Sequence, residues 1–179
     1  GIDVEQASAE TVCAGDAGQP MLRINIRTVN TEPAMTAGAF AFTTNATNAT
    51  VSAAGLYYTG ASATFSAANL VGSAEVTADA FAINPAAAVT LAEGDNYFWL
   101  AYDVADDAVN GQTVDAALVS VELNGSTESP AEGNPEGCRV VENIVYSHAD
   151  QGTVTNRVNG SIVLRTKAKN DYSTEYEAG

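Results

Sequence analysis

The stretch Asn96-Tyr97-Phe98-Trp99-Leu100-Ala101-Tyr102-Asp103 predicts the fold class of this chain. It contains the only tryptophan and the densest group of aromatic residues. Successive side chains of a β-strand point to opposite faces, so Tyr97, Trp99 and Ala101 share one face. Phe98, Leu100 and Tyr102 share the other. Apolar residues on both faces indicate a central strand that is covered on both sides.

Shorter segments with strand character lie on both sides of this stretch, separated by turns rich in glycine and asparagine. The clearest runs over 21–29, where Leu22, Ile24 and Ile26 face one way and polar residues the other. The segment 61–70 is the best candidate for a short helical turn. We expect further strands over residues 39–44, 51–58, 73–83, 114–123 and 139–146, and a hairpin joining 153–158 to 161–166 through Asn159-Gly160. Many short strands with evenly spaced turns predict an all-β fold, a β-sandwich of the immunoglobulin-like or jelly-roll type.

The charge balance excludes several classes of partner. The chain has 22 acidic and 7 basic residues, which gives a net charge of −15. Nucleic acid and anionic lipid both require a cationic surface, so neither is expected as a partner. No apolar run has the length of a transmembrane helix, so membrane insertion is not expected either. We expect a secreted, periplasmic or cell-surface protein from which a signal peptide has been removed.

The two cysteines, Cys13 and Cys138, allow two interpretations. Neither has a second thiol or a histidine at zinc-ligand spacing, which argues against a zinc site. In an oxidising compartment they could form a disulfide that joins the first strand to a late one. The alternative is a pair of buried thiols, and the sequence leaves both open.

A series of short segments spread over the chain forms an ordered pattern. Its pieces are Leu22-Arg23-Ile24-Asn25-Ile26, Tyr57-Tyr58-Thr59-Gly60, Phe65, Gly72, Leu91-Ala92-Glu93-Gly94, Asn96 to Asp103, Ala108, Gly111 and Asp115-Ala116. In order and spacing they resemble the N-terminal, non-catalytic domain of BNR-repeat neuraminidases (sialidases) of Bacteroidetes-type bacteria. The resemblance covers about residues 10–125 and is strongest around the aromatic strand. It implies a secreted β-sandwich that accompanies a carbohydrate-active enzyme and has no catalysis of its own. The Ser-x-Asp-x-Gly-x-x-Trp box of the catalytic propeller does not occur, so no sialidase residue is carried over.

The expected domain organisation follows from these segments. Residues 8–125 form the β-sandwich module. Residues 126–137 are polar, contain Gly and Pro, and form a linker or an exposed loop. Residues 138–167 add strands that complete the sandwich or begin a following domain, and 168–179 are a polar tail.

Two tyrosines are the candidate carbohydrate-binding residues. Aromatic residues in strands are more often core than surface, so Trp99 and Tyr97 are expected inside the sandwich. Tyr58 and Tyr102 lie on the opposite face from a core neighbour, and we expect them to be available for a sugar ring.

The acidic turn after the aromatic strand contains Asp103, Asp106 and Asp107. Calcium takes several oxygen ligands, so this turn is a candidate structural calcium site. The alternative is a plain acidic turn whose carboxylates accept hydrogen bonds from nearby amides. No other cofactor is expected.

No pair of carboxylates or nucleophile with a base stands out as a catalytic constellation, so the chain is not expected to be an enzyme. The leading hypothesis is a non-catalytic accessory module of a glycan-degrading protein, whose partners are glycans or neighbouring domains. The alternative is a structural or adhesive cell-surface subunit that acts through protein–protein contacts.

Overall fold

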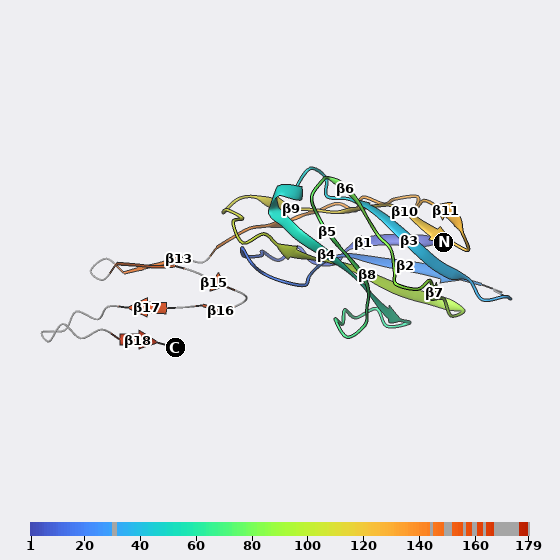
Figure 1. Cartoon of the computed structure of the whole chain (residues 1–179), viewed down its shortest axis with the longest axis horizontal. Helices are drawn as coiled ribbons and strands as arrows, with labels where there is room; N and C mark the ends of the chain where they lie inside the picture. The colour runs from blue at the N-terminus through green and yellow to red at the C-terminus, as the bar shows by residue number, and fades with distance from the viewer. Residues whose placement is uncertain are drawn as a thin grey trace, which may run out of the picture.

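Strand β8 (Gly94–Val104) is the centre of a five-stranded antiparallel sheet in the computed structural model (Figure 1). The structure describes residues 1–29 and 32–143 in full and, beyond them, the backbone of the short strands from β13 onward. The sheet has the order β1-β2-β8-β4-β5 and also contains β1 (Ile2–Gln6), β2 (Gln19–Thr28), β4 (Val51–Gly60) and β5 (Leu70–Glu75). The central position predicted for the aromatic strand is confirmed.

A second antiparallel sheet faces the first and completes the β-sandwich, as the sequence predicts. Its order is β11-β10-β3-β6, and β7 also pairs with β3. Two smaller elements, the strand pair β9–β12 and the 3-10 turn η1, accompany the two sheets. The bounds are β3 (Thr36–Thr43), η1 (Asn48–Thr50), β6 (Ala80–Ile83), β7 (Val89–Thr90), β9 (Thr113–Val114), β10 (Ala117–Leu123), β11 (Ser126–Glu128) and β12 (Arg139–Val140).

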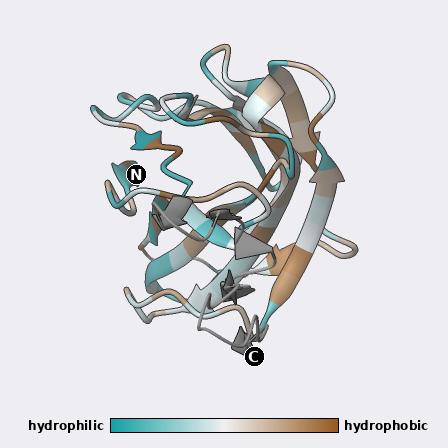
Figure 2. Cartoon of the chain, turned by 90° about the vertical axis from the view of Figure 1, so that its left-hand side faces the viewer, coloured by the Kyte–Doolittle hydropathy of each residue, from teal (hydrophilic) through white to brown (hydrophobic). Residues whose placement is uncertain are grey.

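The core lies between the two sheets. The ring of Phe40 in β3 packs against that of Phe98 in β8, with centroids 4.9 Å apart. The alternating residues of β2 (Leu22, Ile24 and Ile26) are all buried in the same cluster. Each such side chain stabilises the fold by roughly 1.5–3 kcal/mol through burial. Figure 2 shows hydrophobic segments in the strands and hydrophilic ones in many of the loops.

Several sequence-based expectations about individual elements are wrong. The segments 114–123 and 139–146 are each divided between two strands, β9 and β10 in the first and β12 and β13 (Val145–His148) in the second. The segment 73–83 is not one strand, because the chain leaves the first sheet after β5 and enters the second at β6. The segment 61–70 contains no helix, and residues 61–69 form a loop with turns at 61 and 67–68. The sandwich also begins earlier than expected, with β1, whose exposed Asp3 and Glu5 alternate with partly buried residues.

Residues 126–143 pack on the sandwich. β11 pairs with β10, and the Leu118 amide donates a hydrogen bond to the Gly133 carbonyl at 2.8 Å. A Cβ atom at Gly133 would lie 2.0 Å from the Leu118 oxygen, so only glycine fits. Further on, Arg139 is 3% exposed and its guanidinium donates to the Glu10, Thr11 and Pro20 carbonyls and to Gln19 Oε1. These contacts join the late segment to the connection between β1 and β2 and to the first residues of β2.

Beyond residue 143 the described strands pair with one another. The hairpin predicted to join 153–158 to 161–166 is confirmed only next to Asn159-Gly160, where Arg157 pairs with Ile162 and Val158 with Ser161, while the two turn residues lie outside the described residues. The outer parts of the two predicted strands pair with other segments instead. One strand falls within the expected polar tail. The pairs are β13 (Val145–His148) with β14 (Gly152–Thr155), β15 (Arg157–Val158) with β16 (Ser161–Ile162), and β17 (Leu164–Thr166) with β18 (Tyr176–Ala178).

Candidate functional site

The two faces of β8 have the opposite assignment from the one expected. Phe98, Leu100 and Tyr102 belong to the core between the sheets. Tyr97 and Trp99 lie on the outer face of the five-stranded sheet, where Tyr97 remains half-exposed. The outer face therefore carries the Tyr97 ring, which is partly accessible to solvent.

Tyr102 is not a surface residue, which corrects its candidacy for carbohydrate binding. Its side chain is 0% exposed and packs against Phe81, with ring centroids 6.1 Å apart. Within the described residues its buried hydroxyl has no hydrogen-bond partner. Burial raises the pKa of Tyr102 well above its ordinary value, and the carboxylates of Asp115 and Asp79 raise it further. Tyr102 therefore serves the core.

Tyr58 also faces the core, so its candidacy as an exposed platform is corrected as well. Its ring packs against Phe98 at 4.7 Å, and its hydroxyl donates to Asn96 Oδ1 at 2.8 Å. Burial raises the pKa of Tyr58. The Asn96 side chain, itself fully buried, donates in turn to the carbonyls of Ile26, Ala92 and Gly94. Tyr58 thus belongs to a hydrogen-bonded network at one end of the sandwich.

Trp99 is buried, as expected, but under a loop on the outer face. Its side chain is 5% exposed, and the ring of Phe65 packs against it with centroids 5.6 Å apart. The indole Nε1 donates to Thr59 Oγ1 at 3.0 Å. Phe65 also makes an edge-on contact with Tyr57 at 5.5 Å. The loop 61–69, for which the sequence predicts a helical turn, thus packs over Trp99 and shields this part of the outer face of β8 from solvent.

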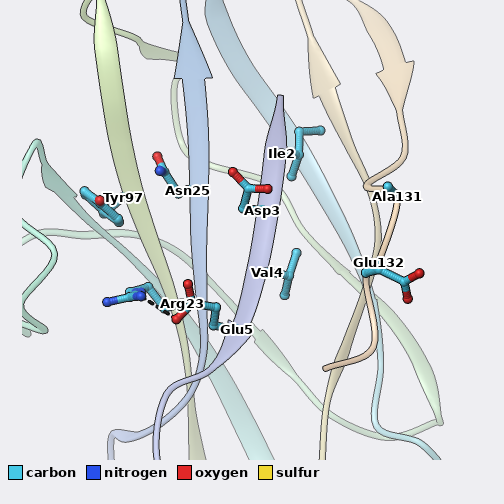
Figure 3. A pocket seen from close by; sticks show the side chains of 9 residues that line it. All are labelled: Ile2, Asp3, Val4, Glu5, Arg23, Asn25, Tyr97, Ala131 and Glu132. Atoms are coloured by element: carbon cyan, nitrogen blue, oxygen red, sulfur yellow. Dashed lines mark hydrogen bonds and ion pairs between the residues drawn. The ribbon is translucent and has the colours of Figure 1, made fainter. Parts of the chain in front are cut away.

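A hollow of about 350 Å³ follows the edge strand β1 (Figure 3). Asp3 in β1, Asn25 in β2 and Tyr97 in β8 are paired positions in one row across the three strands. Glu5 and Arg23 are paired in the next row. The complete lining is Ile2, Asp3, Val4, Glu5, Arg23, Asn25, Tyr97, Ala131 and Glu132.

Figure 3 shows the lining on two sides of β1. The side chains of Asp3 and Glu5 lie on the side of Asn25 and Arg23, whereas Ile2 and Val4 point towards Ala131 and Glu132. The first side is polar and aromatic, and the second combines aliphatic groups with one carboxylate. A concave surface with a few convergent polar groups and an aromatic ring suits a small polar ligand.

Ion pairs and hydrogen bonds fix the positions of the side chains around Tyr97. The Arg23 guanidinium lies 5.9 Å from the centre of the Tyr97 ring and forms an ion pair with Glu5. The Asn25 amide donates to Asp95 Oδ1 at 3.1 Å. Asp95 also faces the exposed Arg27 guanidinium at 3.7 Å. Sequence reasoning missed this site, although the polar positions of 21–29 already placed Arg23 and Asn25 on the face opposite the core.

The acidic turn does not gather its carboxylates. Asp103 Oδ1 accepts a hydrogen bond from the Gly18 amide at 2.7 Å, whereas Asp106 and Asp107 are exposed in the following turn. Over residues 1–29 and 32–143, no three acidic, histidine or cysteine side chains are placed to hold a metal ion together. The arrangement of Asp103, Asp106 and Asp107 matches the acidic-turn alternative and corrects the calcium-site alternative.

Cys13 and Cys138 are not joined to each other. Cys13 is a buried thiol whose Sγ donates to the Glu142 carbonyl at 3.2 Å, and Cys138 is a half-buried thiol. The structure corrects the disulfide alternative. Residues 10–20 and the late segment are held together instead by hydrogen bonds, among them those of Arg139.

Comparisons with known proteins agree with this architecture. The model of the family described as the N-terminal domain of BNR-repeat neuraminidase matches residues 2–127. The solved structure of Hadza microbial sialidase Hz136 superposes with a TM-score of 0.58 at 12% sequence identity, which shows a shared fold. The superposition covers 75% of this chain and 30% of that one. No curated protein sequence matches the chain. In the part of the chain that the structure describes, no helix is long and apolar enough to cross a membrane.

Proposed function

The chain belongs to the family of N-terminal domains of BNR-repeat neuraminidases, and from this premise we propose that it is a non-catalytic accessory module of a secreted or cell-surface glycan-degrading protein. The observation that carries the proposal is the family match, which spans both sheets of the sandwich from β1 to β11. The module positions a neighbouring catalytic domain or binds carbohydrate weakly, so that the enzyme stays close to its substrate.

Tethering is the physical reason such a module would help. Linking a weak binding site to a catalytic domain makes the second encounter with the same surface intramolecular. The benefit is then large on a polymer or cell surface that displays many glycans, and small on a short soluble substrate.

The experiment compares the parent protein with and without residues 1–143. On a soluble small sialoside we expect kcat/KM to change by less than about twofold, because no reacting group is removed. On mucin immobilised on a surface we expect kcat/KM to fall by about tenfold, because the catalytic domain would no longer be held at a high effective concentration near its substrate. The isolated chain is expected not to release sialic acid from either substrate, and robust hydrolysis by it would overturn the proposal.

The structural or adhesive alternative makes a different prediction. An adhesive subunit would associate with itself or with a protein partner, and light scattering would show a mass that rises with concentration. We expect a constant monomer mass over the same range. Family membership favours the accessory function over this alternative.

A further inference from the structure

We infer that the hollow along β1 is a binding site for an uncharged sugar ring, with Tyr97 as the stacking residue and the carboxylates of β1 as hydrogen-bond acceptors. The inference rests on the proposed function as an accessory module and names the site and the ligand class. Its basis is the placement of one half-exposed aromatic ring among convergent polar groups in a concave surface.

The row Asp3, Asn25 and Tyr97 sets the dimensions of the site. The three residues are direct cross-strand partners, so the row spans two strand spacings, or about 10 Å. A ring placed on Tyr97 therefore lies one strand spacing from Asn25 and two strand spacings from Asp3. In Figure 3 all three lie on the same side of the sheet.

The Tyr97 ring supplies the apolar contact. Its orientation is supported by the Arg23 guanidinium, 5.9 Å from the ring centre, which is held in turn by Glu5. A ring fixed by such contacts loses little conformational entropy when it binds a ligand. A half-buried tyrosine ring offers an apolar surface to the C–H face of a sugar ring and carries a polar hydroxyl at its end.

The polar groups suit hydroxyl donors. Asp3 is an exposed carboxylate on the same side of β1 as Asn25 and Tyr97, and an ionised carboxylate accepts only. Hydrogen bonds from sugar hydroxyls to such carboxylates are charge-assisted and roughly twice as strong as neutral ones. A ligand rich in hydroxyl groups therefore matches the lining better than one rich in acceptors.

The charge of the hollow discriminates against acidic sugars. Its lining contains the carboxylates of Asp3, Glu5 and Glu132 and one cation, Arg23, which is already paired with Glu5. A ligand carboxylate at this site would face like charges, and like-charge juxtaposition lowers affinity for the wrong partner. We therefore expect the site to prefer glycans that end in a neutral sugar over the same glycans capped by sialic acid.

The test uses the 179-residue chain and a pair of oligosaccharides, galactose-terminated N-acetyllactosamine and its sialylated form. Binding is followed by NMR titration of backbone amides. We expect the neutral form to bind at least about fivefold tighter, a difference of about 1 kcal/mol. The amides of β1, β2 and β8 should shift first. Equal or tighter binding of the sialylated form would overturn the preference.

Variants locate the site. Tyr97→Ala should weaken binding by about tenfold or more, whereas Tyr97→Phe keeps the ring and should restore most of it. Tyr57→Ala is the matched control, because Tyr57 is an aromatic residue of the same sheet that does not line the hollow. Asp3→Asn removes the carboxylate on the Tyr97 side of β1 and should narrow the difference in affinity between the two oligosaccharides.

The outcomes separate this inference from the proposed function. Glycan binding that Tyr97→Ala leaves unchanged would place the ligand elsewhere and overturn the site, while the accessory function would stand. Binding of neither oligosaccharide at millimolar concentration would also overturn the site and leave only the positioning function. Circular dichroism of each variant shows whether a loss reflects unfolding.

Discussion

The rings of Trp99 and Phe65 lie 5.6 Å apart on the outer face of the five-stranded sheet. Trp99 is in the central strand, and Phe65 belongs to the loop 61–69 that follows β4. A strand that is apolar on both faces needs two covers, because each exposed aromatic face would cost hydration free energy. The second sheet covers one face of β8, and this loop covers Trp99 on the other.

Phe65→Ala should uncover the indole. We expect a red shift of the tryptophan emission and a loss of about 1–2 kcal/mol of unfolding free energy, less than for a fully buried phenylalanine because Phe65 is half-exposed. Fluorescence spectra and urea unfolding measure the two effects. Phe81→Ala removes a half-buried ring that packs against Phe42 in the second sheet, away from Trp99. This variant should destabilise the protein without shifting the tryptophan emission. An unshifted spectrum for Phe65→Ala would contradict the loop's role as cover.

Tyr102→Phe should stabilise the protein. The Tyr102 hydroxyl is buried and has no hydrogen-bond partner in the described part of the chain, and such a group costs about 1–3 kcal/mol. Removing it should raise the unfolding free energy by about 1 kcal/mol at neutral pH. Urea unfolding tests this. A destabilised variant would mean that the hydroxyl is satisfied in solution, for example by a buried water.

The same residue predicts alkaline unfolding. Burial raises the pKa of Tyr102, and to a lesser degree that of Tyr58, above the ordinary value in the unfolded chain. The folded state then holds these protons more tightly, so stability is complete below about pH 10 and falls as the pH rises above it. Tyr102→Phe should move the alkaline unfolding midpoint, measured by circular dichroism, to higher pH. An unchanged midpoint would show that other groups control it.

Asn96→Ala should be one of the more costly substitutions in the chain. Its amide donates to three backbone carbonyls and accepts from the Tyr58 hydroxyl and the Ala92 amide. Leaving these buried groups without partners should cost about 2–4 kcal/mol. Asn69→Ala is the control, because its exposed amide donates only to the Tyr58 carbonyl and its loss should cost less than about 0.5 kcal/mol. Equal costs in thermal unfolding would contradict the network.

Arg139→Met tests whether the sandwich needs residues beyond 127, where the family match ends. The guanidinium is buried and donates to three carbonyls and Gln19, so its loss should cost about 2–4 kcal/mol. Arg27→Met removes an exposed cation with one long ion pair and should cost less than about 1 kcal/mol.

Truncation tests the same contribution. Because the contacts of Arg139 would be lost, a chain ending at residue 127 should unfold at lower urea concentration than one ending at 143. Identical midpoints would limit the folding unit to the matched residues.

The approximate positions of several main strands could be predicted because period-two patterns are local. Leu22, Ile24 and Ile26 alternate with polar residues, and the structure buries all three. The segment 73–83 could not be divided correctly, because nothing in its local pattern shows that the chain passes from one sheet to the other. The role of the loop 61–69 could not be predicted either, because it packs on Trp99 through a contact between residues that are distant in sequence.

The candidate site illustrates the same limit. For β2 the polar positions identified the outer face, which placed Arg23 and Asn25 away from the core. For β8 both faces are apolar, and no local rule decides which of them meets the other sheet. The sequence therefore predicts surface positions for Tyr102 and Tyr58 and a core position for Tyr97, whereas in the structure Tyr102 and Tyr58 face the core and Tyr97 lies on the outer face.

The stretch from Asn96 to Asp103 by itself determined that the chain has a central strand covered on both sides, because alternation and apolarity are properties of adjacent residues. Only the tertiary structure decided which segment of the chain packs against each face of this strand. Phe98, Leu100 and Tyr102 meet the second sheet, Trp99 meets the loop containing Phe65, and Tyr97 remains half-exposed beside β1. That choice depends on the summed packing of segments far apart in the chain, which the pattern of one strand does not contain.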